Sequence, residues 1–131
     1  MSNNHNQTRP VYMNLTQIKL PISAISSITH RLAGIYIFFI TLPLALFLLY
    51  FSTKSYNDFM FISDSFNNSI LFATFVSFSF LVFAYHILTG VRHLLQDLHI
   101  GESLQASKVS SYAVFFLWFL LVCLTFSKVY L

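Results

Sequence analysis

The stretch LAGIYIFFITLPLALFLLYFST, residues 32–53, contains no charged side chain and decides the fold class. Two further stretches without Asp, Glu, Lys or Arg follow, at residues 65–91 and 109–127. A bilayer core takes about 20 apolar residues of helix to cross. The three stretches therefore predict an all-α membrane protein with three transmembrane helices.

The expected helices leave little of the chain outside the membrane. We expect them at about residues 21–52, 66–94 and 109–129, after a polar N-terminal segment at residues 1–20. Pro21 suits the first turn of a helix, where its missing N–H costs no hydrogen bond. Residues 1–131 are therefore interpreted as a single membrane-anchor domain.

The composition limits the functions open to this chain. It has 131 residues, of which 56% are hydrophobic and 8% charged, against about 25% charged residues in soluble domains. Three helices leave no room for a separate soluble domain, so we expect no enzyme activity from the chain on its own. The net charge of +3 comes without clustered Lys or Arg. This pattern favours contact with membrane lipid over nucleic acid.

The basic residues predict the orientation of the chain. Most of them precede the first uncharged stretch or lie between the second and the third: Arg9, Lys19, Arg31, Arg92 and Lys108, leaving only Lys54 and Lys128 for the other side. The positive-inside rule therefore predicts a cytoplasmic N-terminus. The first 20 residues match neither a signal peptide nor a mitochondrial presequence. We expect a multi-pass protein of the bacterial inner membrane, with the mitochondrial inner membrane as the less favoured alternative.

A stripe of functional residue types begins the first expected helix. Ser27, His30, Arg31 and Gly34 stand at i, i+3, i+4 and i+7, which places them on one helical face. The stripe fits a ligand-binding face. It fits equally well a membrane-interface anchor in which Arg31 reaches lipid headgroups.

The second expected helix carries a similar stripe, made of His86, Gly90, His93 and Asp97. An ionisable residue deep in a membrane helix is a functional-site candidate by default. His86 is either a metal ligand or a core histidine bonded to a neighbouring helix. Gly90 would leave space beside a flat macrocycle bound to His86. His93 and Asp97, nearer the interface, are candidates to support that ligand or to carry protons.

One deep histidine supplies only one axial ligand of a six-coordinate haem. A second ligand would have to come from another chain, and the polar helix faces also need a partner to cover them. We therefore expect this chain to form part of a hetero-oligomeric, haem-binding helix bundle.

Three motifs resemble the cytochrome b membrane-anchor subunit of succinate dehydrogenase, the succinate:quinone oxidoreductase known as respiratory complex II. They are Arg-Pro at residues 9–10, SSITHRLAG at residues 26–34 and HILTGVRHLLQD at residues 86–97. The resemblance runs from Arg9 to the third expected helix and is nearest to the proteobacterial form, which has two small anchor subunits.

The resemblance implies roles for individual residues. His86 would be an axial ligand of a haem b iron shared with the second anchor subunit, which provides the other histidine. Ser27 and Arg31 would line the ubiquinone site, and His30 and Arg31 would lie near the haem propionates. A tyrosine of the partner subunit would complete the quinone contacts.

The expected function is therefore that of a haem-bearing, quinone-binding anchor. Succinate would be oxidised in a flavoprotein subunit, and electrons would pass through an iron–sulfur subunit to ubiquinone. Two alternatives remain open from the sequence: an anchor of fumarate reductase, and a structural membrane anchor without haem.

Overall fold

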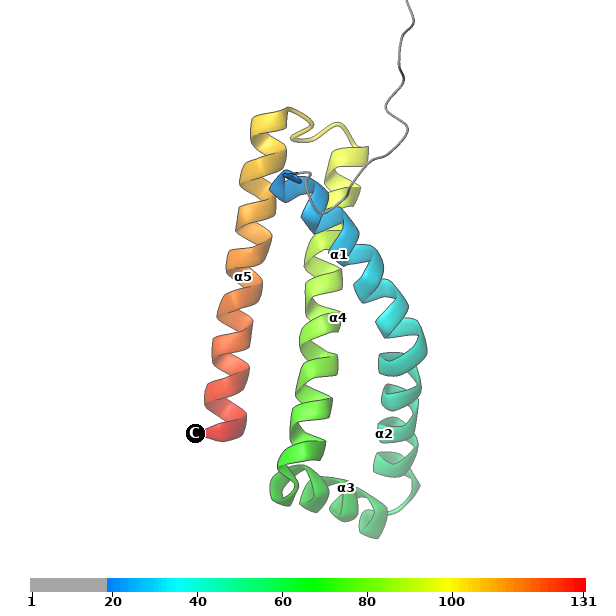
Figure 1. Cartoon of the computed structure of the whole chain (residues 1–131). Helices are drawn as coiled ribbons and strands as arrows, with labels where there is room; N and C mark the ends of the chain where they lie inside the picture. The colour runs from blue at the N-terminus through cyan, green and yellow to red at the C-terminus, as the bar shows by residue number, and fades with distance from the viewer. Residues whose placement is uncertain (1–18) are drawn as a thin grey trace, which may run out of the picture.

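The computed structural model describes residues 19–131, and the secondary structure within that range is helical throughout (Figure 1). The elements in chain order are α1 (Ile22–Tyr36), the π-helical turn η1 (Ile37–Thr41), α2 (Leu42–Lys54), α3 (Tyr56–Asn68), α4 (Ile70–Asp97) and α5 (Leu104–Tyr130). Nearly all of the polar segment expected at residues 1–20, with the Arg9-Pro10 motif, lies outside the described residues.

Three continuous helices are long and apolar enough to cross a membrane. They are Ile22–Lys54, which joins α1, η1 and α2, then Ile70–Asp97 and Leu104–Tyr130. In Figure 1, α4 runs between α5 and the α1–α2 helix, and α1 leans across the upper part of α4. The expected all-α fold with three transmembrane helices is confirmed by these lengths and compositions.

The first long helix contains a widened turn next to a proline. Pro43 has no N–H, so it cannot donate to the carbonyl oxygen four residues earlier. The chain forms η1 directly before it, and the Leu42 N–H donates to the Ile37 carbonyl oxygen, five residues back. A π-turn thus takes up the irregularity while the helix continues.

The connection after the first span differs from the sequence prediction. We expected the second helix to begin near residue 66, but residues Tyr56–Asn68 form a separate helix, α3, which lies across the lower end of the molecule in Figure 1. Two serine caps divide the chain there. The Ser55 hydroxyl accepts from the Asp58 N–H at 3.1 Å, and the Ser69 hydroxyl accepts from the Phe72 N–H at 3.3 Å.

Two further helix boundaries, the end of α4 and the start of α5, differ from their expected positions. Helix α4 continues to Asp97 rather than residue 94, and α5 begins at Leu104 rather than residue 109. The Ser103 hydroxyl caps α5 by accepting from the Ala106 N–H at 3.2 Å. Arg92 lies within α4, as it does in the helix expected at residues 66–94, and it faces α5.

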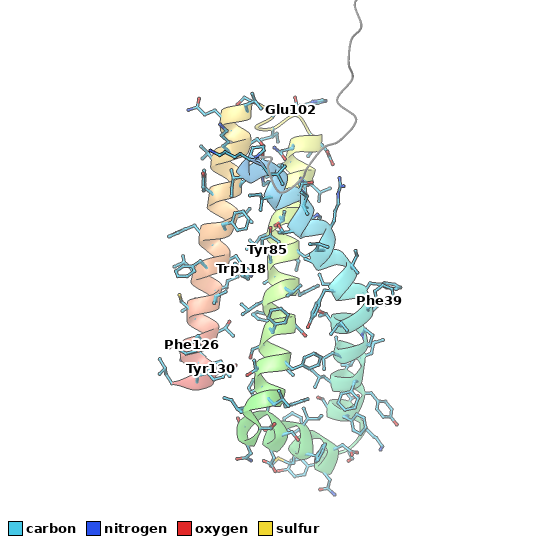
Figure 2. All side chains as sticks on the ribbon, viewed as in Figure 1. Phe39, Tyr85, Glu102, Trp118, Phe126 and Tyr130 are labelled. Atoms are coloured by element: carbon cyan, nitrogen blue, oxygen red, sulfur yellow. The ribbon has the colours of Figure 1, made fainter. Side chains whose placement is uncertain are left out.

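The buried interior is small and partly polar. Tyr85 of α4 packs edge-on against Trp118 of α5, with ring centroids 5.6 Å apart (Figure 2). The Trp118 indole N–H donates to the Leu81 carbonyl oxygen at 2.9 Å. The most deeply buried side chains are small hydroxyl residues: Ser26, Ser79, Thr89 and Ser111. Small residues of this kind allow membrane helices to pack closely.

Most of the apolar surface remains uncovered by this chain. Only 6–17% of the most apolar window of each spanning helix is buried. An aqueous monomer would not be stable with so much exposed apolar surface. The surface is therefore suited to lipid and to other membrane helices.

Candidate functional site: a histidine cluster between α1 and α4

His86 is held by a backbone contact across two helices. Its Nδ1 atom lies 3.2 Å from the carbonyl oxygen of His30 in α1. A carbonyl oxygen can only accept, so Nδ1 is the protonated nitrogen and donates this hydrogen bond. The lone pair of the neutral ring is then on Nε2. Metal-binding histidines are commonly oriented in this way, with the second ring nitrogen donating to a carbonyl oxygen.

Two further histidines lie beside His86 and complete the histidine cluster, defined as His30, His86 and His93. The His30 ring stacks on the His86 ring with centroids 4.1 Å apart and an angle of 15° between the planes. The His93 ring lies 5.1 Å from His30, tilted by 60°. Stacking covers one face of His86, whereas the Nε2 lone pair points along the ring plane. His30 therefore orients His86 without blocking that lone pair.

Two glycines lie beside the histidine rings of the cluster. A Cβ atom on Gly34 would lie 3.2 Å from Cε1 of His86, closer than ordinary van der Waals contact. A Cβ atom on Gly90 would instead lie 3.5 Å from Nε2 of His30. The glycine that makes room for the His86 ring is therefore Gly34 on the facing helix. The role expected for Gly90, space beside a macrocycle bound to His86, concerns a different place and stays a prediction.

The other predicted residues lie around the cluster with different exposures. Ser27 is half-buried in α1, and Arg31, one turn further on, is exposed. Asp97 is exposed at the end of α4. The stripe on α1 thus divides in the structure: the His30 backbone and Gly34 face α4, whereas Arg31 extends outward and remains available to another molecule.

Arg92 makes contacts that the sequence analysis missed. It is a cation only 5% exposed, and it links α4 to the first turns of α5. Its Nε donates to the Ser110 hydroxyl at 3.0 Å, and its Nη2 donates to the Ser107 hydroxyl at 2.8 Å and carbonyl oxygen at 3.2 Å. The available signal was Ser107, Ser110 and Ser111 at i, i+3 and i+4, a hydroxyl stripe on the next helix.

A second missed contact lies deeper in the membrane region. The hydroxyl groups of Thr29 in α1 and Tyr85 in α4 are hydrogen-bonded to each other. About two turns away along α1 and α4, the Tyr36 hydroxyl lies 3.1 Å from that of Ser79. These two pairs fix the rotation of α1 against α4, which in turn determines where His30 and Gly34 stand relative to His86.

The cluster fits a haem better than a metal ion held by protein ligands alone. Within residues 19–131, no three or more His, Cys, Asp or Glu side chains are arranged to hold a metal ion. A haem brings four nitrogen ligands of its own and takes one imidazole from each axial side. One oriented imidazole, with its Nε2 lone pair available and glycine at the facing position, meets that requirement.

The buried Nε2 atom of His30 also fits a bound ligand at this cluster. Within the described residues it has no hydrogen-bond partner. A buried polar atom without a partner costs free energy unless a ligand or water satisfies it. An acidic group of a bound ligand close to His86 would satisfy this nitrogen.

Comparison with known proteins agrees with this geometry. The profile of the family "Succinate dehydrogenase/Fumarate reductase transmembrane subunit" matches residues 5–125. The succinate dehydrogenase cytochrome b556 subunit of Coxiella burnetii is 35% identical over 121 residues, which cover 91% of this chain and 94% of that protein. The cytochrome b560 subunit of Porphyra purpurea is 31% identical and covers 93% and 98% of the two chains.

A third relative, the cytochrome b556 subunit of Rickettsia prowazekii, is 31% identical over 106 residues, or 81% of each chain. All three relatives are named as cytochrome b subunits of succinate dehydrogenase, so the likeness does not favour a fumarate reductase anchor or an anchor without haem. The chain matches these relatives over most of its length and has three helices long and apolar enough to span a membrane. It therefore belongs to the family of succinate dehydrogenase/fumarate reductase transmembrane subunits and is a cytochrome b anchor of the succinate dehydrogenase kind.

Proposed function

We propose that this chain holds one side of a haem b shared with a second anchor subunit, and that it forms part of the site where ubiquinone is reduced. The observation that carries the proposal is the orientation of His86. Its Nδ1–H donates to the His30 carbonyl oxygen, so the Nε2 lone pair is available to the haem iron. The second axial histidine comes from the other anchor.

The residues around His86 have separate tasks in this proposal. Gly34 leaves room for the imidazole, and the stacked His30 ring keeps it from rotating. His30 and Arg31 contact the haem propionates, and the unpartnered Nε2 of His30 is suited to donate to one of them. When bound, haem b accepts and releases one electron at its iron.

The quinone site is formed by Ser27 and Arg31, one turn apart on α1. Arg31 is exposed, so its guanidinium can donate a charge-assisted hydrogen bond to a quinone carbonyl oxygen. Ser27 positions the same ring through its hydroxyl group. His93 and Asp97 lie at the same end of α4 and are suited to move protons toward the reduced quinone.

The assembly follows from these roles. Succinate is oxidised on a flavoprotein subunit, and an iron–sulfur subunit passes electrons to quinone at the end of the bundle that carries Arg31. This end faces the cytoplasm of a bacterium, in accord with the excess of basic residues there. The uncovered apolar faces of the three helices accommodate the second anchor and the surrounding lipid.

The test is an optical difference spectrum, reduced minus oxidised, of the assembled complex purified from membranes. The variant His86→Ala should lose the low-spin b-type signal or change it to high spin. The matched control is His99→Ala, because His99 is exposed in the loop between α4 and α5 and is bonded only to Glu102 among the described residues. That variant should keep the wild-type spectrum.

Subunit composition is measured on the same samples, so that loss of haem is separated from loss of assembly. A normal low-spin spectrum in an assembled His86→Ala complex would disprove the ligand assignment. A wild-type complex without any haem signal would favour the structural anchor instead.

A further inference from the structure

A groove between α4 and α5 combines an apolar surface with a buried cation. Its volume is about 490 Å³, within the ~300–1,000 Å³ range of ligand sites. We call it the α4–α5 groove, and its principal lining residues are Leu88, Arg92, Leu95, Ala113, Val114 and Leu117. It lies on the side of α4 that faces α5, whereas the histidine cluster lies between α4 and α1.

The groove has the length of half a bilayer. Along α5 it extends from Ala106 to Leu117, about 16 Å at ~1.5 Å per residue. One leaflet contributes about 15 Å to a hydrocarbon core of ~30 Å. The groove therefore reaches from the interface end of the bundle to the level of the bilayer centre, as a single lipid acyl chain does.

Arg92 lies near the interface end of this groove and carries a charge that the protein does not neutralise. The chain has four acidic side chains, all within the described residues, and none forms an ion pair with Arg92 there. Two of its nitrogens, Nε and Nη2, donate hydrogen bonds to serine hydroxyl and carbonyl oxygens. Its third nitrogen, Nη1, has no hydrogen bond within residues 19–131, and Arg92 lines the groove.

Arg92 is the one charged residue that lines the groove within residues 19–131. No Asp or Glu lines the groove among the described residues. An uncompensated cation is costly in a low-dielectric region unless an anion accompanies it. The apolar length and the positive end together specify an amphiphile with a negative head.

We propose that the α4–α5 groove binds one anionic phospholipid. One acyl chain lies along Leu95, Ala113 and Leu117, and the phosphate accepts from Nη1 of Arg92. The lipid covers an apolar surface that would otherwise be open, and it neutralises Arg92. This site is independent of the haem and quinone contacts proposed above, which lie on α1 and on the facing side of α4.

The experiment uses the assembled complex, stripped of lipid in a neutral detergent and then incubated with equal amounts of phosphatidylglycerol and phosphatidylcholine with identical acyl chains. Bound lipid is counted by native mass spectrometry. The wild-type complex should retain one phosphatidylglycerol, preferred about fivefold, the ratio expected from about 1 kcal/mol per basic group at an anionic lipid. Equal retention of the two lipids, or retention of neither, would overturn the proposal.

Two kinds of variant separate the head group from the chain. Arg92→Gln should remove the preference for phosphatidylglycerol, and Arg92→Lys should restore it. Ala113→Phe should abolish retention by filling the groove. Ala113 is exposed, so the larger side chain does not overpack a buried position. The matched control is Ala45→Phe, at an exposed position of α2 that does not line the groove.

The Ala113→Phe variant keeps the proposal testable even if Arg92→Gln does not assemble, because it leaves the contacts of Arg92 with α5 intact. Unchanged lipid retention in Ala113→Phe would overturn the proposal. Loss of another subunit from that variant, combined with no retained lipid in the wild type, would also overturn it and would assign the groove to a protein partner.

Discussion

The two ends of the helix bundle use their polar residues in opposite ways. At the end where α1 and α5 begin, polar groups join different helices and are largely buried: His86 bonds the His30 backbone, and Arg92 bonds Ser107 and Ser110. At the end that carries α3, the ion pair of Lys54 with Asp58 is local and at the surface. A hydrogen bond between helices there, Thr74 with Tyr130, is also exposed.

The difference supports the proposal that the functional site lies at the end where α1 and α5 begin. Buried polar groups within a membrane bundle are costly, so they persist where they position or bind something. The exposed polar groups at the α3 end cap helices, form a local ion pair and join Thr74 to Tyr130 at the surface. Substitutions of the same kind at the two ends should therefore have unequal effects, and each of the following experiments compares such a pair.

The largest difference is expected for removal of a positive charge. Arg31→Leu should lower succinate-driven reduction of a short-chain quinone by roughly 10- to 150-fold, because a charged hydrogen bond contributes ~1.5–3 kcal/mol. Lys54→Leu, at the α3 end, should leave that activity near the wild-type level. Reduction of a soluble dye by the same enzyme should be unaffected in both. Equal loss of quinone and dye reduction in Arg31→Leu would place Arg31 outside the quinone site and identify it as a lipid-facing anchor.

A similar difference is expected for added volume. Gly34→Leu should reduce the haem content of the assembled complex by roughly 5- to 150-fold, since overpacking costs ~1–3 kcal/mol and a Cβ atom alone would lie 3.2 Å from His86. Ala45→Leu, at an exposed position of α2, serves as the control and should keep full haem content. The measurement is haem per complex by extraction and absorbance. Full haem content in Gly34→Leu would mean that the imidazole does not need this gap.

A third difference concerns stability. Arg92→Met removes hydrogen bonds between a charged group and α5, which should lower the free energy of unfolding by ~1.5–3 kcal/mol. Lys54→Met removes an exposed ion pair, which contributes ~0–1 kcal/mol. The two variants are compared by thermal dissociation of the assembled complex. Similar destabilisation would show that the two ends do not differ in their polar contacts.

The smallest difference is expected for single hydroxyl pairs. A double-mutant cycle with Thr29→Val and Tyr85→Phe should give a coupling energy of ~0.6 kcal/mol, the average for hydrogen bonds between membrane helices. The same cycle with Thr74→Val and Tyr130→Phe should give less, because that pair is exposed. Thermal dissociation again supplies the measurement. A larger coupling for the Thr74–Tyr130 pair would reverse the proposed order of the two ends.

Much of the architecture was predictable because it depends on local sequence. Runs of apolar residues as long as a bilayer is thick specify spanning helices whatever their neighbours are. The helix ends were predicted less well. The caps at Ser55, Ser69 and Ser103 are single hydroxyl groups in a polar stretch, and several serines nearby could have served equally.

The candidate site was predictable only in part. The spacing of His86, His93 and Asp97 identified one face of α4, and the spacing of Ser27, His30 and Arg31 identified one face of α1. Spacing does not specify which part of a residue meets the other helix. In the structure, the His30 carbonyl oxygen, rather than a nitrogen of its ring, contacts Nδ1 of His86. Arg31 is exposed and takes no part in that contact.

By itself, the sequence determined that this is a three-span membrane protein with an ionisable ring deep in the second span, because hydrophobic length and helical period are properties of one segment. Only the tertiary structure decided that Gly34 faces His86 and that Arg92 is buried against α5. His30 and His86 are 56 positions apart in the chain. Their contact depends on the crossing and rotation of two helices, which are determined by packing between segments.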